Sequence, residues 1–352
     1  NYLLAAVGCL SERPSLIRRL FSTSNMRAEC VYSVWLFING IWREIILDDY
    51  IPLVVDKDTV SFAFSRSFED EIWLTLIEKA YAKAYGSYKA IEGGHLVEAI
   101  RDLTGAPFET ISTLPSAEKG EINPLAVWYR LVKAMNEEHL MCAVTKEENE
   151  LFPSIENLQL QANPLADFTY TILSLKEFVD KNNKMIRLVE LRSFSQEVTW
   201  GGPWSPASDL WTAELKQRHW KLGPDQGVFF MPFEDGLKYF REFIISMAKP
   251  TNLTNSLEMD DLIESNKSKF CVRMDIIQDG YYTIGVDQLD ARYFDEKHAY
   301  SYVRVTLARV FHDGVTIEFI GCTFGKEKSQ FVSANLVAGR YVIMVECYWT
   351  QT

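Results

Sequence analysis

The stretch of residues 71–94 constrains the fold of this chain more than any other. Its apolar side chains recur at helical spacing, at Trp73, Leu76, Ile77, Ala80 and Tyr81. Such a stripe predicts an amphipathic helix over residues 72–85 that packs one face against a core. Gly86 follows directly and ends the helix, because glycine readily adopts the left-handed backbone found at helix C-termini.

The first hundred residues are expected to be mainly helical, since residues 3–10 also carry apolar side chains at helical spacing. One hairpin interrupts them. Asn39-Gly40 separates the apolar runs Val34–Ile38 and Trp42–Leu47, and Asn-Gly between two such runs is the strongest short-range hairpin signal.

The pattern changes after about Gly105, where strand-like runs replace most of the helical ones. We expect helices at Leu125–Met135 and Phe233–Met247, and strands at Leu140–Val144, Phe168–Leu173, Met185–Leu191 and Val228–Met231.

The last third of the chain begins with the best linker in the sequence, the polar residues 251–269. Short alternating runs follow it without a helix signal, which predicts an antiparallel β-sandwich. The expected strands are Phe270–Ile276, Tyr281–Val286, Tyr302–Val310, Val315–Ile320 and Tyr341–Cys347.

The composition limits the classes of partner and the cellular compartment that we expect for this protein. The 352 residues carry a formal net charge of −12, which disfavours non-specific binding to nucleic acid or to anionic membranes. No apolar run approaches the length of a membrane-spanning helix. The six cysteines have neither metal-site nor redox spacing, so we expect buried free thiols in a reducing, cytoplasmic compartment. The chain opens directly into a helical pattern and stops soon after a strand pattern, and we interpret it as part of a longer protein.

Seven blocks of sequence follow one another along about 240 residues: Asn1–Leu10, Trp42–Pro52, Trp73–Gly94, Asp102–Gly105, Leu188–Arg192, Val198–Ser205 and Phe229–Phe240. In this order they resemble the calpain family of cysteine proteases. The resemblance implies an α+β fold, with a papain-like two-lobed protease core followed by the calpain-type β-sandwich. It divides the chain into a first lobe (residues 1–104), a second lobe (105–250), a linker (251–269) and the sandwich (270–352).

The same resemblance identifies three replaced catalytic positions. Calpains use a Cys, a His and an Asn, which here correspond to Asn1, Phe168 and Ser193. A carboxamide is not a nucleophile of this kind, and a phenyl ring cannot transfer a proton. Each replacement also has a purely structural role, as a helix cap, as apolar filling and as a turn residue. Losing one member of such a group can cost about a million-fold in rate.

Two thiols stay open as replacement nucleophiles. Cys9 lies about two helical turns beyond Asn1, where the family carries a small residue, so a packing role is favoured. Cys142 with His139 is a conceivable pair, but Cys142 stands in an apolar strand-like run. Beyond them, the histidines have no metal spacing, and no cofactor is expected.

Calpain cores are assembled by Ca²⁺, which takes clustered oxygen ligands. Glu71 matches one ligand of the first-half site, and an exposed acid at a helix start explains it equally well. The second-half positions hold neutral residues, so we expect that site to be lost; they are Thr199, Pro206, Gln226 and Val228, with Asp209 and Asp225 shifted nearby. A loop of the sandwich carries Asp287, Asp290, Asp295 and Glu296. Such a loop could bind Ca²⁺ or a basic partner, although solvated acidic loops are more frequent.

Three functions follow from the resemblance. The first is a catalytically inactive scaffold or protein-binding module, whose partners the resemblance places in the cytoskeleton or a cilium. The second is an active calcium-dependent endopeptidase with a relocated nucleophile. The third is a Ca²⁺- or lipid-responsive sandwich. None of them involves nucleic acid or membrane insertion.

Overall fold

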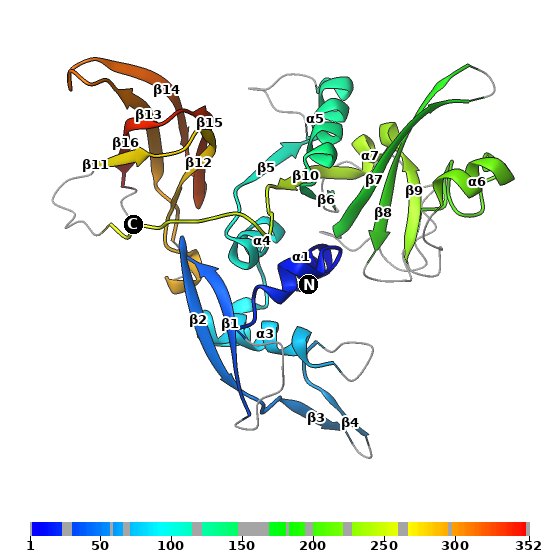
Figure 1. The fold of residues 1–352 in the computed structure, drawn as a ribbon. Helices are drawn as coiled ribbons and strands as arrows, with labels where there is room; N and C mark the ends of the chain where they lie inside the picture. The colour runs from blue at the N-terminus through cyan, green and yellow to red at the C-terminus, as the bar shows by residue number, and fades with distance from the viewer. Residues whose placement is uncertain are drawn as a thin grey trace. The chain divides into compact units, whose positions relative to one another are not determined.

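The chain folds into two compact units that interleave along the sequence (Figure 1). The computed structural model describes residues 2–22, 30–56, 59–65, 71–114, 122–146, 169–180, 183–193, 200–220, 227–259, 267–294 and 298–349. Unit 1 contains residues 1–32, 48–78 and 92–252; unit 2 contains residues 33–47, 79–91 and 253–352. The domain boundaries expected from the sequence stay predictions.

The helical part of unit 1 is built on α1 (Tyr2–Ser11), which packs against α2 (Pro14–Arg18) and α4 (Leu96–Thr104). Gly105 ends α4 with a left-handed backbone of φ 65°, and its N–H donates to the carbonyl oxygen of Arg101. The small ribbon β3 (Leu53–Asp56) and β4 (Thr59–Phe62) also belongs to this unit.

The second part of unit 1 is a six-stranded antiparallel sheet in the order β5-β10-β6-β7-β8-β9 (Figure 1). The strands are β5 (Phe108–Ser112), β6 (Leu140–Thr145), β7 (Thr169–Val179), β8 (Met185–Ser193), β9 (Val228–Pro232) and β10 (Phe240–Ser246). Helices α5 (Pro124–Asn136) and α7 (Phe233–Tyr239) pack on it through Trp128 and Phe233, whose rings lie 5.1 Å apart. Helix α6 (Ala213–His219) lies between β8 and β9 in the chain.

The single helix expected over Phe233–Met247 is wrong. Helix α7 stops at Tyr239, and the following seven residues form β10. Phe240, Phe243 and Ile244 mimic helical spacing, but β10 lies between β5 and β6 and is almost fully buried. Pairing on both edges outweighs local periodicity, and adjacent isoleucines suit a strand buried on both faces.

Unit 2 contains the hairpin β1 (Val31–Ile38) and β2 (Ile41–Asp48) from Ser33 to Leu47, together with the second half of α3 (Trp73–Ala84) and the short 3-10 helix η1 (Lys89–Ile91). The hairpin turn is confirmed at Asn39 and Gly40. Their φ angles of 52° and 80° are both positive, as a type I′ turn requires. The side chain of Lys83 in α3 donates to the carbonyl oxygen of Ile46, which ties the helix to the hairpin.

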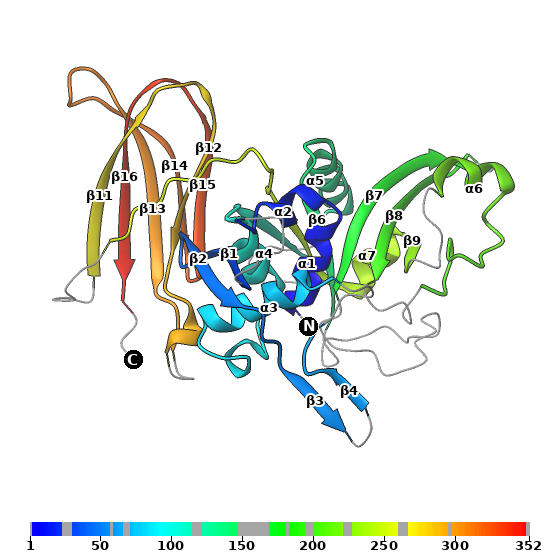
Figure 2. The same ribbon diagram turned by 60° about the horizontal axis from the view of Figure 1, so that its bottom comes forward.

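The β-sandwich is confirmed as the main part of unit 2 (Figure 2). One sheet has the order β11-β16-β13-β14 and the other pairs β12 with β15. Their bounds are β11 (Lys267–Ile276), β12 (Gly280–Asp287), β13 (Tyr302–Val310), β14 (Ile317–Gly325), β15 (Ser329–Leu336) and β16 (Gly339–Tyr348), with the 3-10 helix η3 (Ala291–Tyr293) between β12 and β13. Val305 and Val345 of one sheet and Val332 of the other share the core. The sequence interpretation missed β15, because its polar residues weaken the alternation.

The α+β fold class is therefore confirmed, with a mixed core followed by a β-rich domain. Among the described residues, no helix has both the length and the apolar character needed to span a membrane.

Candidate functional site

The elements that would carry the catalytic groups are formed, although two of the three positions lie outside the described residues. Asn1 precedes α1 and Phe168 precedes β7 in the chain, and neither side chain is described. Ser193 is the last residue of β8 and pairs with Tyr170, the second residue of β7. Helix α1 contacts both β6 and β7. The sheet thus brings the end of β8 beside the start of β7, in unit 1 with α1.

Ser193 is held by its backbone in a crowded position. Its side chain is buried, and its N–H donates to the carbonyl oxygen of Gly227 at 2.9 Å. Gly227 has a φ of 72°, and a Cβ there would lie 2.7 Å from the Ser193 carbonyl oxygen. Only glycine fits so close an approach at this backbone angle. An Asn amide orients an imidazole by accepting its ring N–H at Oδ1, and the shorter side chain of serine carries no amide oxygen at that reach.

The two candidate replacement thiols lie against each other. The Sγ atoms of Cys142 in β6 and Cys9 in α1 are 2.9 Å apart, and both residues are buried. The hydrogen bond to Cys9 and then burial raise the pKa of the Cys142 thiol well above its ordinary value. The thiolate is the nucleophilic form of cysteine. Cys142 is therefore held in its unreactive form at neutral pH.

His139 is not prepared to activate Cys142. Burial lowers the pKa of its imidazole, and Glu137 opposes that effect only in part. Its Nδ1 lies 3.6 Å from a Glu137 oxygen. A neutral imidazole provides no positive charge to stabilise a thiolate, so the pair lacks the electrostatics of a cysteine protease.

The other cysteines only partly match the expectation of buried thiols. All six lie in the described residues and none forms a disulfide, and Cys9, Cys142 and Cys347 are buried. Cys271 and Cys322 are exposed on strands of the sandwich, and Cys30 is half-buried. Strand alternation turns the exposed thiols outward, which apolar neighbours in the sequence did not reveal.

The calcium positions are described in part. Glu71 is exposed and accepts a hydrogen bond of 2.7 Å from Nε1 of Trp73, at the start of α3. In the second half, Val228 is fully buried in β9 and has no oxygen in its side chain to offer a cation. Thr199, Gln226 and Asp225 lie outside the described residues, whereas Pro206 and Asp209 are in the turns before α6. Within the described ranges, His, Cys, Asp and Glu side chains form no group of three that could hold a metal ion.

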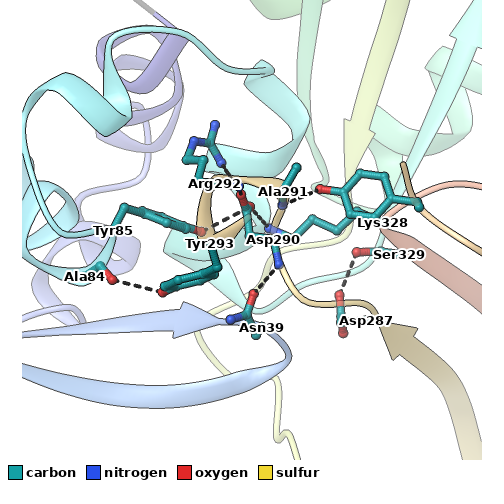
Figure 3. A network of polar contacts seen from close by, with 11 residues as sticks. Asn39, Ala84, Tyr85, Asp287, Asp290, Ala291, Arg292, Tyr293, Lys328 and Ser329 are labelled. Atoms are coloured by element: carbon teal, nitrogen blue, oxygen red, sulfur yellow. Dashed lines mark hydrogen bonds and ion pairs between the residues drawn. The ribbon is translucent and has the colours of Figure 1, made fainter. Parts of the chain in front are cut away.

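The acidic loop of the sandwich contains a charge-compensated cluster (Figure 3). The Asp290 side chain is 2% exposed, and its carboxylate pairs with Arg292 Nη1 at 2.9 Å and with Lys328 Nζ. Burial raises the pKa of Asp290, but Lys328 and Arg292 outweigh it and leave the pKa below its usual value. Asp287 accepts a hydrogen bond of 2.6 Å from the Ser329 hydroxyl. Asp295 and Glu296 lie outside the described residues.

The same cluster joins the sandwich to the hairpin and to α3 within unit 2. The backbone N–H of Asp290 donates to Asn39 Oδ1 at 2.9 Å, and the Tyr85 hydroxyl lies 3.4 Å from its carboxylate (Figure 3). Arg292 lies over the Tyr85 ring at 5.0 Å, and the Tyr293 hydroxyl donates to the Ala84 carbonyl oxygen. Asp290 is thus a structural ion. In the sequence, the only indication that the negative charge of Asp290 would be compensated was the presence of isolated basic residues in the sandwich.

Comparison with known proteins gives one consistent result. The profile of the calpain family cysteine proteases matches residues 1–247. The chain is 30% identical to the calpain-type cysteine protease DEK1 of Arabidopsis thaliana over 258 residues, which are 73% of this chain and 11% of that protein. It is 29% identical to Calpain-9 of Rattus norvegicus over 263 residues, 72% of this chain and 36% of the relative.

Calpain-A of Drosophila melanogaster matches at 27% identity over 311 residues, which are 83% of this chain and 34% of that protein. This match extends into the sandwich, because 83% of the chain is more than the residues that precede the sandwich. In each case the chain spans about a third or less of the relative's length. With the mixed core, the β-rich domain and the profile in agreement, the chain belongs to the calpain family of cysteine proteases.

Proposed function

We propose that this chain is a catalytically inactive calpain homologue that serves as a scaffold or protein-binding module. The observation that carries the proposal is that Asn1, Phe168 and Ser193 stand at the positions to which the family resemblance assigns the catalytic Cys, His and Asn. A core that keeps its helices, sheet and buried aromatic residues does not need these groups to fold. Without them it retains surfaces for binding but no nucleophile, base or orienting amide.

The burial and protonation of the candidate replacement thiol support the proposal. A relocated protease site needs a thiolate within reach of an imidazole in a cleft. Cys142 is buried against Cys9 with its pKa raised, and the pKa of His139 is lowered. Both shifts favour the neutral forms. An endopeptidase with a relocated nucleophile at this pair, the second candidate function, is therefore disfavoured electrostatically.

Peptide hydrolysis by the full chain tests the proposal. We expect no turnover of an unfolded protein or of a fluorogenic peptide, with or without millimolar Ca²⁺, above that of a Cys9→Ala/Cys142→Ala variant. An epoxide that alkylates protease cysteines should label no residue stoichiometrically. Turnover that this epoxide abolishes, and that the double variant lacks, would establish a relocated nucleophile and overturn the proposal.

The sandwich as a Ca²⁺- or lipid-responsive module is the third candidate. Because Lys328 and Arg292 already neutralise Asp290, a cation at that carboxylate would have to displace two ion pairs. Titration calorimetry with Ca²⁺ should give no heat of binding at the sandwich, and a stoichiometric heat that Asp290→Asn removes would favour this candidate instead.

A cytoskeletal or ciliary partner rests on the family resemblance and on no particular residue. Co-sedimentation of the full chain with microtubules tests it, with actin filaments as the control. Retention only with microtubules is the expected result, and equal recovery with and without filaments contradicts it.

A further inference from the structure

One face of the sandwich combines positive charge with exposed aromatic rings. It is the outer side of the sheet β11-β16-β13-β14, and we call it the basic–aromatic face. Its defining residues come from four strands and the turn after β14: Lys269, Tyr302, Arg304, Phe324, Lys326 and Tyr348. In a chain of net charge −12, such a face is a local exception.

Strand register determines which side chains lie on this face. Lys269, Glu346, Arg304 and Phe324 form one row across the sheet through consecutive pairings. The alternate residues Val303 and Val305 point to the opposite side and are buried in the sandwich core. Because side chains alternate along a strand, the whole row points away from that core.

The aromatic residues are arranged as a surface and not as a core. The rings of Tyr302 and Phe324 stack with centroids 5.4 Å apart and planes 15° apart. Tyr348 meets Phe324 edge-on at 6.0 Å. Tyr302 is 44% exposed and Phe324 is 53% exposed, so the stack is available to a partner. Aromatic residues and arginine are enriched at protein interfaces and among their energetic hot spots.

Arg304 and Lys326 each lie over a ring of this stack. The guanidinium of Arg304 lies 5.2 Å from the Phe324 ring, and Lys326 Nζ lies 5.7 Å from the Tyr302 ring. The side chain of Glu346 is almost buried. Its Oε1 lies 3.4 Å from Lys269 Nζ, and its Oε2 lies 3.5 Å from Arg304 Nη1. One carboxylate cannot occupy the three donors of a lysine and the five of an arginine. Among the described residues, Lys326 has no carboxylate partner within ion-pair distance.

We propose that the basic–aromatic face binds an acidic peptide segment of a partner protein in an extended conformation. Lys269 and Arg304 are two strand spacings apart, about 9–10 Å. In the extended polyproline II conformation a chain advances about 3.1 Å per residue with three residues per turn, so carboxylates three residues apart lie on one side of the peptide and match this separation. Charge complementarity selects the acidic segment, and the ring stack supplies apolar contact between the charges.

This inference rests on the proposed function, because it assigns a surface and a ligand chemistry to the binding module. The two can nevertheless fail separately. Peptide hydrolysis decides whether the chain is inactive, whereas binding to the sandwich can be measured whatever that result is.

The test uses the full chain and a fluorescein-labelled peptide of about ten residues, with Glu at every third position and Ser between. Fluorescence anisotropy at low salt should show saturable binding, lost when Gln replaces Glu and weakened by added salt. The double reversal Arg304→Glu/Lys326→Glu should weaken binding about tenfold or more. Tyr302→Ala should weaken it less, because it removes only half of the ring stack.

The matched control is Lys89→Glu/Arg218→Glu, which changes net charge equally at two exposed positions that are not among the residues defining this face. It should leave binding unchanged. Lys326→Ala, a mild change in an exposed turn, covers the case in which the double reversal misfolds. Equal affinities for the two double variants, or no binding of the Glu peptide by the unmodified chain, would overturn the proposal. So would binding confined to anionic phospholipid vesicles, since the surface would then recognise lipid.

Discussion

Two buried clusters of this protein, one in each unit, differ in how their polar atoms are accommodated in the interior. In unit 1, Cys9 and Cys142 place two sulfur atoms against each other in an apolar interior. In unit 2, Asp290 places a charged carboxylate in the interior and compensates it with Lys328 and Arg292. Both clusters are buried, but only the second is held together by ion pairs.

The difference between the two clusters is that buried charge occurs in unit 2, whereas the thiol pair of unit 1 acts as apolar packing. A thiol pair of this kind behaves as small apolar filling, and the raised pKa of the Cys142 thiol makes that thiol unreactive. A buried carboxylate is tolerated only while its partners stay in place, so it fixes the arrangement of everything it touches. In this protein the fixed arrangement is that of the sandwich loop with the hairpin turn and α3.

The largest expected effect is the loss of Asp290. Asp290→Ala removes the carboxylate that pairs with the buried cations of Lys328 and Arg292, and removing one partner of a buried pair typically costs about 3–5 kcal/mol. Urea unfolding followed by fluorescence should show this decrease in the free energy of unfolding. Glu327→Ala, an exposed acid in the neighbouring turn, is the control and should stay within about 0.5 kcal/mol. Similar values for the two variants would show that the cluster does not stabilise the fold.

The next effect concerns the strand end that carries Ser193. Gly227→Ala forces a Cβ to within 2.7 Å of the Ser193 carbonyl oxygen at a φ of 72°. Backbone strain of this kind costs about 1–3 kcal/mol, and the clash adds to it. Gly314→Ala is a matched control, since its φ is 69° and its Cβ would meet nothing within 4 Å. Equal losses of unfolding free energy would mean that the close approach to Ser193 carries no cost.

A smaller effect is expected at the thiol pair. Cys9→Ala/Cys142→Ala removes two buried sulfur atoms and should cost about 1–2 kcal/mol, comparable with deleting two methylene groups. In the native chain, an aromatic disulfide reagent should modify Cys271 and Cys322 quickly, but Cys9 and Cys142 only on unfolding. Fast native-state modification of Cys142, identified by peptide mapping, would contradict an inert pair.

The smallest effect is the response to acid. The pKa of Asp290 is lowered in the folded state, so its contribution to stability is complete above its ordinary pKa, near 4, and is lost as pH falls through the lower folded value. We expect the unfolding free energy of the native chain to fall below about pH 4 more steeply than that of Asp290→Asn. Parallel pH profiles for the two proteins would exclude a lowered pKa. Protonation costs less than Asp290→Ala, because the side chain keeps its packing.

The sequence predicted most elements where one local signal was strong. Helix α3 was expected from its apolar stripe and Gly86, and the hairpin from Asn39-Gly40. Strand β10 was mistaken for helix because its local periodicity fits both structures. Strand β15 was missed because its pattern is polar. Of the candidate site, the identities of Asn1, Phe168 and Ser193 came from the sequence, whereas the crowded setting of Ser193 did not.

The sequence by itself determined the family's scaffold and predicted which residues stand at its catalytic positions, since both depend on residue identity and local pattern. Only the tertiary structure decided that Cys9 meets Cys142, and that Asp290 meets Lys328 and Asn39. Asn39 and Asp290 are 251 positions apart, and no short-range signal specifies such a contact. Packing fixes these pairs, because buried charge and buried apolar surface each require a particular neighbour, which the chain supplies from a distant segment.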